Sequence, residues 1–276
     1  MKLTLGFSPC PNDTFIFDAI VNRRIDTSFF DFSIHMADVE ELNKMAFESV
    51  LDITKISAAA YPKIADNYFL LDSGSAIGNN NGPILISKQK IFPDEINDLK
   101  IAIPGFNTTA NLLLSIAFPK AINKKEYIFS NIEEVVLSGE TDAGLIIHET
   151  RFTYQAKGLK KVVDLGEFWE RNFGMLVPLG CIAIKRKYSR EIIETINLLI
   201  RESVEFAFKN PDKSAEYIKK HAQELDTDVI QKHINLYVNQ YTIDQGTEGR
   251  KAIKFLFEKG FELKLLPEIT KDIFIE

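Results

Sequence analysis

The chain has 276 residues, of which 45% are hydrophobic and 26% charged, and 33 basic against 39 acidic side chains give a formal net charge of −6. This composition is typical of a folded globular protein and excludes a disordered, collagen-like or coiled-coil chain. The acidic balance argues against a nucleic-acid partner, because phosphate backbones are bound by clustered lysine and arginine. The length suits one large α/β domain or two lobes of ordinary size.

The small number of cysteines and the short apolar runs argue against a disulfide-rich, secreted or membrane-spanning protein. Cys10 and Cys181 are too few for a disulfide scaffold and lack the paired spacing of a zinc site, so we predict no metal. The apolar run at the N-terminus is interrupted at residues 8–11, before it reaches the length found in a signal peptide. No run approaches the ~18 apolar residues of a membrane helix. We therefore expect a cytoplasmic protein with no membrane partner.

The predicted secondary structure changes near residue 189, from alternating strands and helices to helices alone. Before it, β-type runs alternate with helical periodicity, which favours parallel strands joined by right-handed crossovers. The expected strands are residues 2–7, 30–35, 51–54, 68–71, 83–87, 100–103, 127–129, 143–147, 161–164 and 180–185. The expected helices between them are residues 39–47, 58–65, 109–118, 132–137 and 168–173. Afterwards only helical patterns occur, at residues 189–210, 211–221, 229–237 and 246–257.

The loop at residues 72–83 is the strongest run of turn-forming residues and is expected to be a crossing between two lobes. If the chain returns near residues 178–185, residues 1–85 and 186–276 form one lobe and residues 86–185 the other. A two-lobed α/β protein of this kind binds its ligand in the cleft between the lobes. The only tryptophan, Trp169, is expected to pack between them.

Polar residues follow the first and third strands directly, where ligands of open α/β sheets bind. Two prolines fix the loop at residues 8–14, and Asn12 and Asp13 there either cap the next helix or contact a ligand. Lys55 and Ser57 stand at the start of another helix. A lysine at that position opposes the helix dipole unless an anion or carboxylate lies nearby.

A glycine-containing turn leads from the strand at residues 100–103 into a helix that opens with Thr108 and Thr109. Free backbone N–H groups at such a helix start suit a carboxylate or a phosphate. Neither a Walker A motif nor a Gly-x-Gly-x-x-Gly fingerprint is present, which excludes nucleotide binding through those devices.

The sharpest candidate is His148, which with Glu149 ends the buried strand at residues 143–147. It is either a base or a satisfied structural residue. Because no Gly-x-Ser-x-Gly motif is present, a catalytic His148 would abstract a proton rather than assist acyl transfer. His35 ends a strand, and His221 and His233 lie on polar helical stretches, where we expect solvated surface side chains.

At these junctions the sequence resembles the 1,4-dihydroxy-6-naphthoate synthase family of menaquinone biosynthesis. The resemblance rests on residues 8–15, 55–57, 108–110 and 145–149 and spans essentially the whole chain. It implies a two-lobed fold similar to type II periplasmic binding proteins, in an enzyme that converts cyclic dehypoxanthine futalosine to 1,4-dihydroxy-6-naphthoate without metal or cofactor.

The resemblance also implies residue roles. His148 would be the proton acceptor, and a small-molecule carboxylate substrate would be bound by Lys55, Ile56, Ser57, Thr109 and Ala110, with Thr108 as an alternative to Thr109. Asn12 and Asp13 are further candidates, and a homodimer is a possible assembly.

Three alternatives stand beside this interpretation. Chorismate dehydratase has a similar fold but lacks both the opening at residues 8–13 and the His148–Glu149 pair. A non-catalytic protein that binds small anions is permitted by the fold. The effector-binding half of a transcription regulator would need a DNA-binding module for which the chain has no room.

Overall fold

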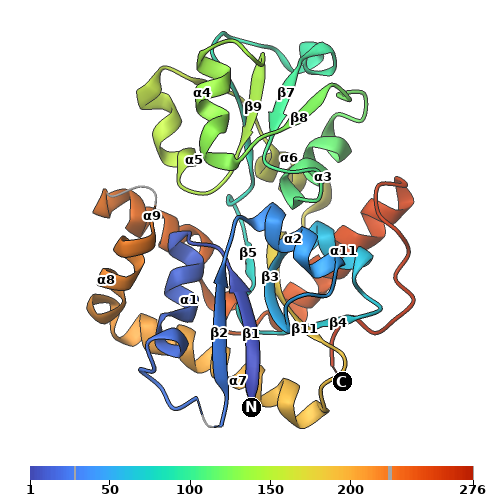
Figure 1. The fold of residues 1–276 in the computed structure, drawn as a ribbon. Coiled ribbons are helices and arrows are strands. Elements are labelled where there is room, and N and C mark those ends of the chain that lie inside the picture. Colours follow the sequence, from blue (N-terminus) through green and yellow to red (C-terminus); the bar gives the residue numbers. More distant parts are fainter. Residues whose placement is uncertain (28, 223–225, 276) are drawn as a thin grey trace.

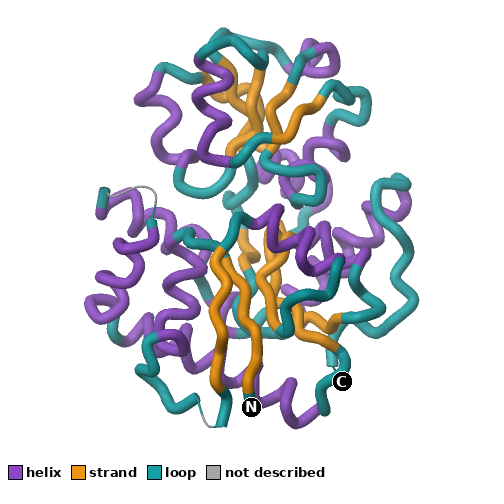
Figure 2. Tube along the Cα trace, in the orientation of Figure 1, coloured by secondary structure: helices purple, strands orange, loops and turns teal. Residues whose placement is uncertain are grey.

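The computed structural model describes every residue except 28, 223–225 and 276. Two separate β-sheets, each with its own helices, form two lobes of an α/β protein (Figure 1). The two-lobed α/β architecture predicted from the sequence is confirmed. Figure 2 shows the strands at the centre of each lobe with helices around them.

The larger lobe contains a six-stranded sheet in the order β2-β1-β3-β11-β4, with β5 paired to β11. Its strands are β1 (Lys2–Phe7), β2 (Asp31–Met36), β3 (Ile53–Ser57), β4 (Tyr68–Leu70), β5 (Ala76–Gly78) and β11 (Val177–Lys185). β1 runs parallel to β2 and β3, whereas β11 is antiparallel to its three partners.

The smaller lobe contains a five-stranded sheet in the order β10-β6-β9-β7-β8. Its strands are β6 (Ile84–Ser87), β7 (Ile101–Ile103), β8 (Lys124–Glu126), β9 (Ala143–Ile146) and β10 (Lys160–Asp164). β7 is parallel to β8 and β9, but β6 is antiparallel to β9 and β10. The expected parallel pairing is therefore wrong for β6, β10 and β11, the strands next to the two crossings between the lobes.

Helices surround both sheets and include the long helix predicted at residues 189–210. The helices are α1 (Pro11–Val21), α2 (Val39–Phe47), α3 (Thr109–Ala117), α4 (Ile132–Leu137), α5 (Thr150–Thr153), α6 (Leu165–Phe173), α7 (Arg190–Lys209), α8 (Pro211–His221), α9 (Thr227–Tyr237), α10 (Gln240–Ile243) and α11 (Gly246–Glu262). Short 3₁₀ turns lie at Ala58–Lys63, Pro93–Asp98, Phe129–Asn131 and Tyr154–Lys157. Ser189 caps α7, because its hydroxyl accepts a hydrogen bond from the backbone N–H of Ile192.

The crossings between the lobes differ in part from the prediction. The first lies between β5 and β6, inside the predicted loop, but the return precedes β11, which pairs throughout with strands of the larger lobe. Residues 177–185 therefore belong to the larger sheet. The two crossings touch at Gly82 and Gly166, where a Cβ atom on Gly82 would lie 2.3 Å from the Gly166 Cα.

Several local predictions are corrected. The strand expected at residues 127–129 is wrong, since β8 lies at Lys124–Glu126 and Phe129 begins a 3₁₀ turn. β5 was missed because its three residues lie inside the run of turn-forming residues at 72–83. The α-helix expected at residues 58–65 is a 3₁₀ turn that contains Pro62. Helix α1 begins at Pro11, so Asn12 and Asp13 lie in its first turn and do not cap it.

Trp169 is fully buried and links α6 to the larger lobe, as predicted. Its ring centroid lies 4.7 Å from that of Phe173 and 5.6 Å from that of Phe255 on α11. Its indole N–H donates to the Leu176 carbonyl at 3.1 Å. Among the described residues, no helix is long and apolar enough to cross a membrane.

Trp169→Ala should lower the free energy of unfolding by about 3–5 kcal/mol, because it removes a large buried side chain and leaves a cavity. Urea denaturation followed by circular dichroism measures this change. Ile122→Ala is the control, because that side chain is 83% exposed. Equal stability losses in the two variants would contradict the role assigned to Trp169.

Candidate active site

The four polar junctions singled out in the sequence meet in one cavity between the lobes, with an internal space of about 80 Å³. All nine candidate site residues line it: Asn12, Asp13, Lys55, Ile56 and Ser57 from the larger lobe, and Thr108, Thr109, Ala110 and His148 from the smaller one. Further lining residues that the sequence did not indicate include Val39, Asn81, Leu179 and Tyr237.

A buried ion pair between Lys55 and Asp13 forms one wall of the cavity. The Lys55 ammonium lies 3.1 Å from Asp13 Oδ1 and donates to the Gly74 carbonyl at 2.9 Å, and both charged side chains are almost fully buried. Asp13 also accepts hydrogen bonds from Ser8 and from the Asn12 amide. The carboxylate expected near Lys55 is thus Asp13, and the two charges neutralise each other inside the protein.

Ser57 is oriented by Asn43, a buried residue on α2 that the sequence analysis did not single out. Asn43 Oδ1 accepts from the Ser57 backbone N–H at 2.9 Å, and Asn43 Nδ2 donates to the Ser57 hydroxyl oxygen at 3.1 Å. Because that oxygen acts as an acceptor here, the Ser57 O–H can donate a hydrogen bond into the cavity. A polar residue between the buried Leu42 and Ala46 of an amphipathic helix was the signal available in the sequence.

The start of α3 forms the opposite wall, and its two threonine hydroxyls have structural roles. Thr108 caps the helix by accepting from the Asn111 N–H, and it donates to the Gly105 carbonyl. The Thr109 hydroxyl donates to Leu179 at 2.7 Å and accepts from the Ala59 N–H at 3.1 Å, which ties the smaller lobe to the larger. The backbone N–H groups at this helix start are therefore the donors best placed for an anion.

His148 follows β9 and is held between two aromatic rings. Its backbone is left-handed, with φ at 59°. The imidazole lies edge-on to Phe129, at 4.9 Å between ring centroids, and stacks on His233 at 5.8 Å. Burial lowers the pKa of His148 from 6.5 to about 4, with Glu149 acting in the opposite direction and His233 adding to the decrease. His148 is therefore neutral at pH 7, the state in which an imidazole accepts a proton.

The expectation that His233 is a solvated surface residue is wrong. Its side chain is fully buried, with Nε2 3.1 Å from Asn12 Oδ1 and Nδ1 3.3 Å from Glu149 Oε2. The sequence held a signal for this position, because His233 shares the buried face of α9 with Ile230, Ile234 and Tyr237. His221 is only partly buried on α8, and His35 is exposed on β2.

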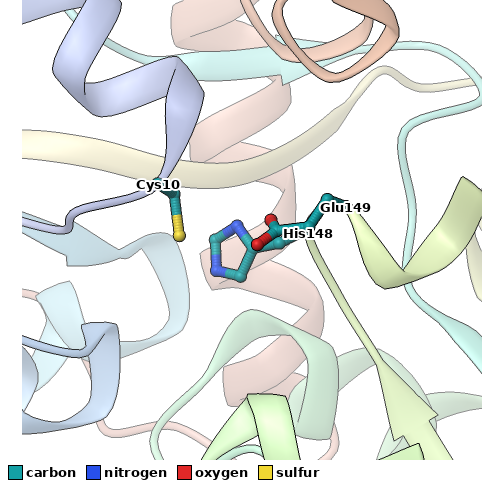
Figure 3. Close-up of side chains that lie close together, drawn as sticks. All are labelled: Cys10, His148 and Glu149. Atoms are coloured by element: carbon teal, nitrogen blue, oxygen red, sulfur yellow. The ribbon is translucent and has the colours of Figure 1, made fainter. Parts of the chain in front are cut away.

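Glu149 and Cys10 lie beside His148 (Figure 3), and the ligand-type atoms of the three side chains lie within 4.8 Å of one another. Sequence spacing could not indicate this cluster, because Cys10 is distant along the chain. Burial raises the pKa of the Cys10 thiol well above its usual value. The thiol is therefore protonated at neutral pH, whereas metal ligation requires the thiolate.

Comparison with known proteins identifies the family. A family model described as "Menaquinone biosynthesis" matches residues 3–262. The chain is 40% identical over 273 residues to the 1,4-dihydroxy-6-naphthoate synthase of Thermus thermophilus, with 99% of each chain covered. It is 36% identical to the enzyme of that name from Streptomyces coelicolor, over 98% of this chain and 96% of the relative. The chain belongs to the 1,4-dihydroxy-6-naphthoate synthase family. It is a lyase of menaquinone biosynthesis.

Solved structures show the same architecture. Protein AF1704 from Archaeoglobus fulgidus is similar with a TM-score of 0.91 and 35% identity, covering 96% of this chain and 98% of its own. The alkanesulfonate-binding protein SsuA from Xanthomonas axonopodis pv. citri has a TM-score of 0.72 at 12% identity, covering 97% of this chain and 95% of its own. The second likeness confirms the periplasmic-binding-protein-like fold predicted from the sequence.

Lys55→Met should lower the free energy of unfolding by about 3–5 kcal/mol, because it leaves the Asp13 carboxylate buried without its cation. Adding Asp13→Asn to Lys55→Met should restore part of that loss, and urea denaturation of both variants measures the difference. The control Lys161→Met breaks a half-exposed pair with Glu167 and should change stability by under about 1 kcal/mol. A double variant no more stable than Lys55→Met would contradict the pairing argument.

Proposed function

We propose that this lyase converts cyclic dehypoxanthine futalosine to 1,4-dihydroxy-6-naphthoate, with His148 as the proton acceptor. The observation that carries the proposal is the position of His148, whose neutral imidazole lines the same cavity between the lobes as the start of α3. The relatives from Thermus thermophilus and Streptomyces coelicolor bear the name of the enzyme that forms this product.

The substrate is an aromatic carboxylate, and the cleft offers donors for it. The backbone N–H groups of Thr109 and Ala110, supported by the dipole of α3, are proposed to bind the carboxylate, with the Ser57 hydroxyl as a further donor. Lys55 is proposed to act indirectly, because its charge is already paired with Asp13. Asn12 and Asp13 likewise support the wall of the site rather than bind the substrate.

In the proposed reaction, neutral His148 removes a proton from the spiro-fused sugar portion of the substrate. The electron pair left on the sugar oxygen forms a carbonyl group as the carbon–carbon bond to the ring breaks, and the electrons of that bond pass to a ring carbonyl oxygen, so that aromatisation of the naphthoquinol drives the step. His148 becomes an imidazolium and gives its proton to that ring oxygen, which completes the naphthoquinol hydroxyl group. Closure of the lobes around the substrate is proposed to contribute by excluding water and fixing the reacting groups in contact.

His148→Ala should lower kcat by roughly 10²–10⁴-fold and leave KM within a few-fold, because it removes a general base and not the carboxylate donors. Purified enzyme is incubated with cyclic dehypoxanthine futalosine, and product is followed by ultraviolet absorbance and mass. His35→Ala, on the exposed surface of β2, is the matched control. If His148→Ala turns over at the wild-type rate, His148 is not the proton acceptor. If the wild-type enzyme acts on chorismate and not on cyclic dehypoxanthine futalosine, the proposed substrate is wrong.

The pH profile tests the protonation state of the base. Because the folded protein holds the pKa of His148 at about 4, the neutral form persists as pH falls through 6.5 and is lost only near pH 4. The value of kcat/KM should therefore stay level through pH 6.5 and fall on the acid side near pH 4, with circular dichroism confirming folding at each pH. An acid limb centred near pH 6.5 would contradict the burial of the base.

A further inference from the structure

Cys10, His148 and Glu149 bring together three side chains of the kinds that bind zinc in proteins (Figure 3). Their ligand-type atoms, one sulfur, one ring nitrogen and one carboxylate oxygen, all lie within 4.8 Å of one another. Cys10 precedes α1 in the larger lobe, whereas His148 and Glu149 follow β9 in the smaller lobe. Of the three, the reaction proposed above uses only His148, so the thiol and the carboxylate have no assigned role.

A carboxylate oxygen of Glu149 is buried without a hydrogen-bond partner. The side chain is 6% exposed, and Oε2 has no partner with hydrogen-bond geometry among the residues that the structure describes. Nδ1 of the fully buried His233 lies 3.3 Å away and is likewise unsatisfied. Buried polar atoms are satisfied in almost all native folds, so one that is not requires an explanation such as a bound ion. This observation does not depend on the distances within the cluster and points independently to a ligand beside Glu149.

The charges around the thiol favour a cation. Burial raises the pKa of Cys10 well above its usual value, and the carboxylates of Glu149, Asp13 and Asp38 raise it further. The charge of Asp13 is neutralised by Lys55, 3.1 Å away. Against the effect of burial, the neighbouring imidazoles hold the pKa of the Glu149 carboxyl below its usual value. These carboxylates outnumber the one lysine near them, which favours the binding of a cation.

The donor set suits zinc rather than magnesium or calcium. Thiolate sulfur, imidazole nitrogen and carboxylate oxygen bind Zn²⁺ at about 2.0–2.3 Å, so the ligand atoms of a tetrahedral site lie about 3.3–3.7 Å apart. The three atoms here, all within 4.8 Å, have to draw together by about an ångström, which side-chain rotation can supply. Magnesium and calcium prefer sets of oxygen ligands, of which this cluster has one carboxylate.

Zinc binding would release one proton from the cluster. At pH 7 His148 is neutral and Glu149 is ionised, so both already offer a lone pair. Cys10 carries its proton, because burial raises the pKa of its thiol. A bound ion forms a sulfur–zinc bond in place of the sulfur–hydrogen bond, and the proton leaves to solvent. The neutral thiol therefore lowers the affinity for zinc without preventing ligation, and no oxidant or reductant takes part.

We propose that Cys10, His148 and Glu149 form an inhibitory zinc site at the edge of the cavity. The ion reaches the site from the cavity, which His148 lines. A neutral imidazole has a lone pair on only one ring nitrogen, so a ring that ligates zinc has none left to accept a proton. The inhibition rests on the function proposed above, because it assumes that His148 is the base, whereas the binding of the ion does not depend on that function.

The first test measures the binding of cobalt(II), a coloured substitute for zinc, to the intact protein prepared without a histidine tag. A cobalt–thiolate bond produces a charge-transfer band in the near ultraviolet that nitrogen and oxygen ligands do not produce. We expect this band to saturate at one ion per chain and to disappear when zinc is added, but not when magnesium is added. The lack of a band at millimolar cobalt would overturn the proposal.

Matched cysteine variants identify the thiol. Cys10→Ser should abolish the band, whereas Cys181→Ser, at the only other cysteine of the chain, should keep it. Glu149→Gln should weaken cobalt binding by at least about tenfold, since even outer partners of zinc ligands contribute roughly 10–100-fold to affinity. Circular dichroism confirms that each variant is folded. A band that persists in Cys10→Ser, or an unchanged affinity in Glu149→Gln, would show that the ion binds elsewhere and overturn the site.

The second test measures turnover of cyclic dehypoxanthine futalosine at increasing concentrations of zinc. The wild-type enzyme should be inhibited and should recover when EDTA removes the ion. Cys10→Ser should keep its activity within a few-fold and need at least about tenfold more zinc for the same inhibition. Equal zinc sensitivity in the two enzymes would overturn the inhibitory role. A protein that binds cobalt through Cys10 but does not act on this substrate would support the metal site and refute the proposed function.

Discussion

The buried ion pair between Lys55 and Asp13 is the interaction on which the rest of the site depends. It joins the start of α1 to β3, and Lys55 also donates to Gly74 in the loop that leads toward the first crossing. Charges placed in such a cleft must be neutralised by the protein itself, because little water is present to do so. With this pair satisfied, the wall that the larger lobe contributes to the cavity has no uncompensated charge at Lys55 or Asp13.

The two lobes contribute different parts of the proposed chemistry. The smaller lobe carries both the helix start that would hold the carboxylate and His148, while the larger lobe carries Ser57 with its partner Asn43 and the buried His233. Contacts such as that of Thr109 with Ala59 and Leu179 exist only when these parts meet. A fold shared with solute-binding proteins thus becomes an enzyme through the groups that line its cleft.

Much of this arrangement could be predicted from the sequence, because local patterns carry it. Periodicity and caps located β1, α2, α3 and α7, and the rule that ligands bind beyond strand ends located the junctions that form the cavity. The antiparallel pairing of β11 with β3 could not be predicted in this way, because it depends on which strand, distant in the sequence, pairs with the segment after the return crossing.

His233 was missed for a related reason. Its helix contains several polar residues, and its burial depends on α1 and Glu149, which are far away along the chain. The cluster of Cys10, His148 and Glu149 is likewise a property of the closed fold, not of any one segment. Local sequence patterns therefore predict which segments line the site, but not which titratable side chains meet across the cleft.

The central claim is that the start of α3 holds a carboxylate while the neutral imidazole of His148, on the same lobe, faces the rest of the ligand in the cleft. A crystal structure of the enzyme with 1,4-dihydroxy-6-naphthoate tests this most directly. We expect the carboxylate to lie within hydrogen-bond distance of the Thr109 and Ala110 N–H groups, with the quinol ring toward His148. A carboxylate bound elsewhere, or a His148 ring turned away from the ligand, would contradict it.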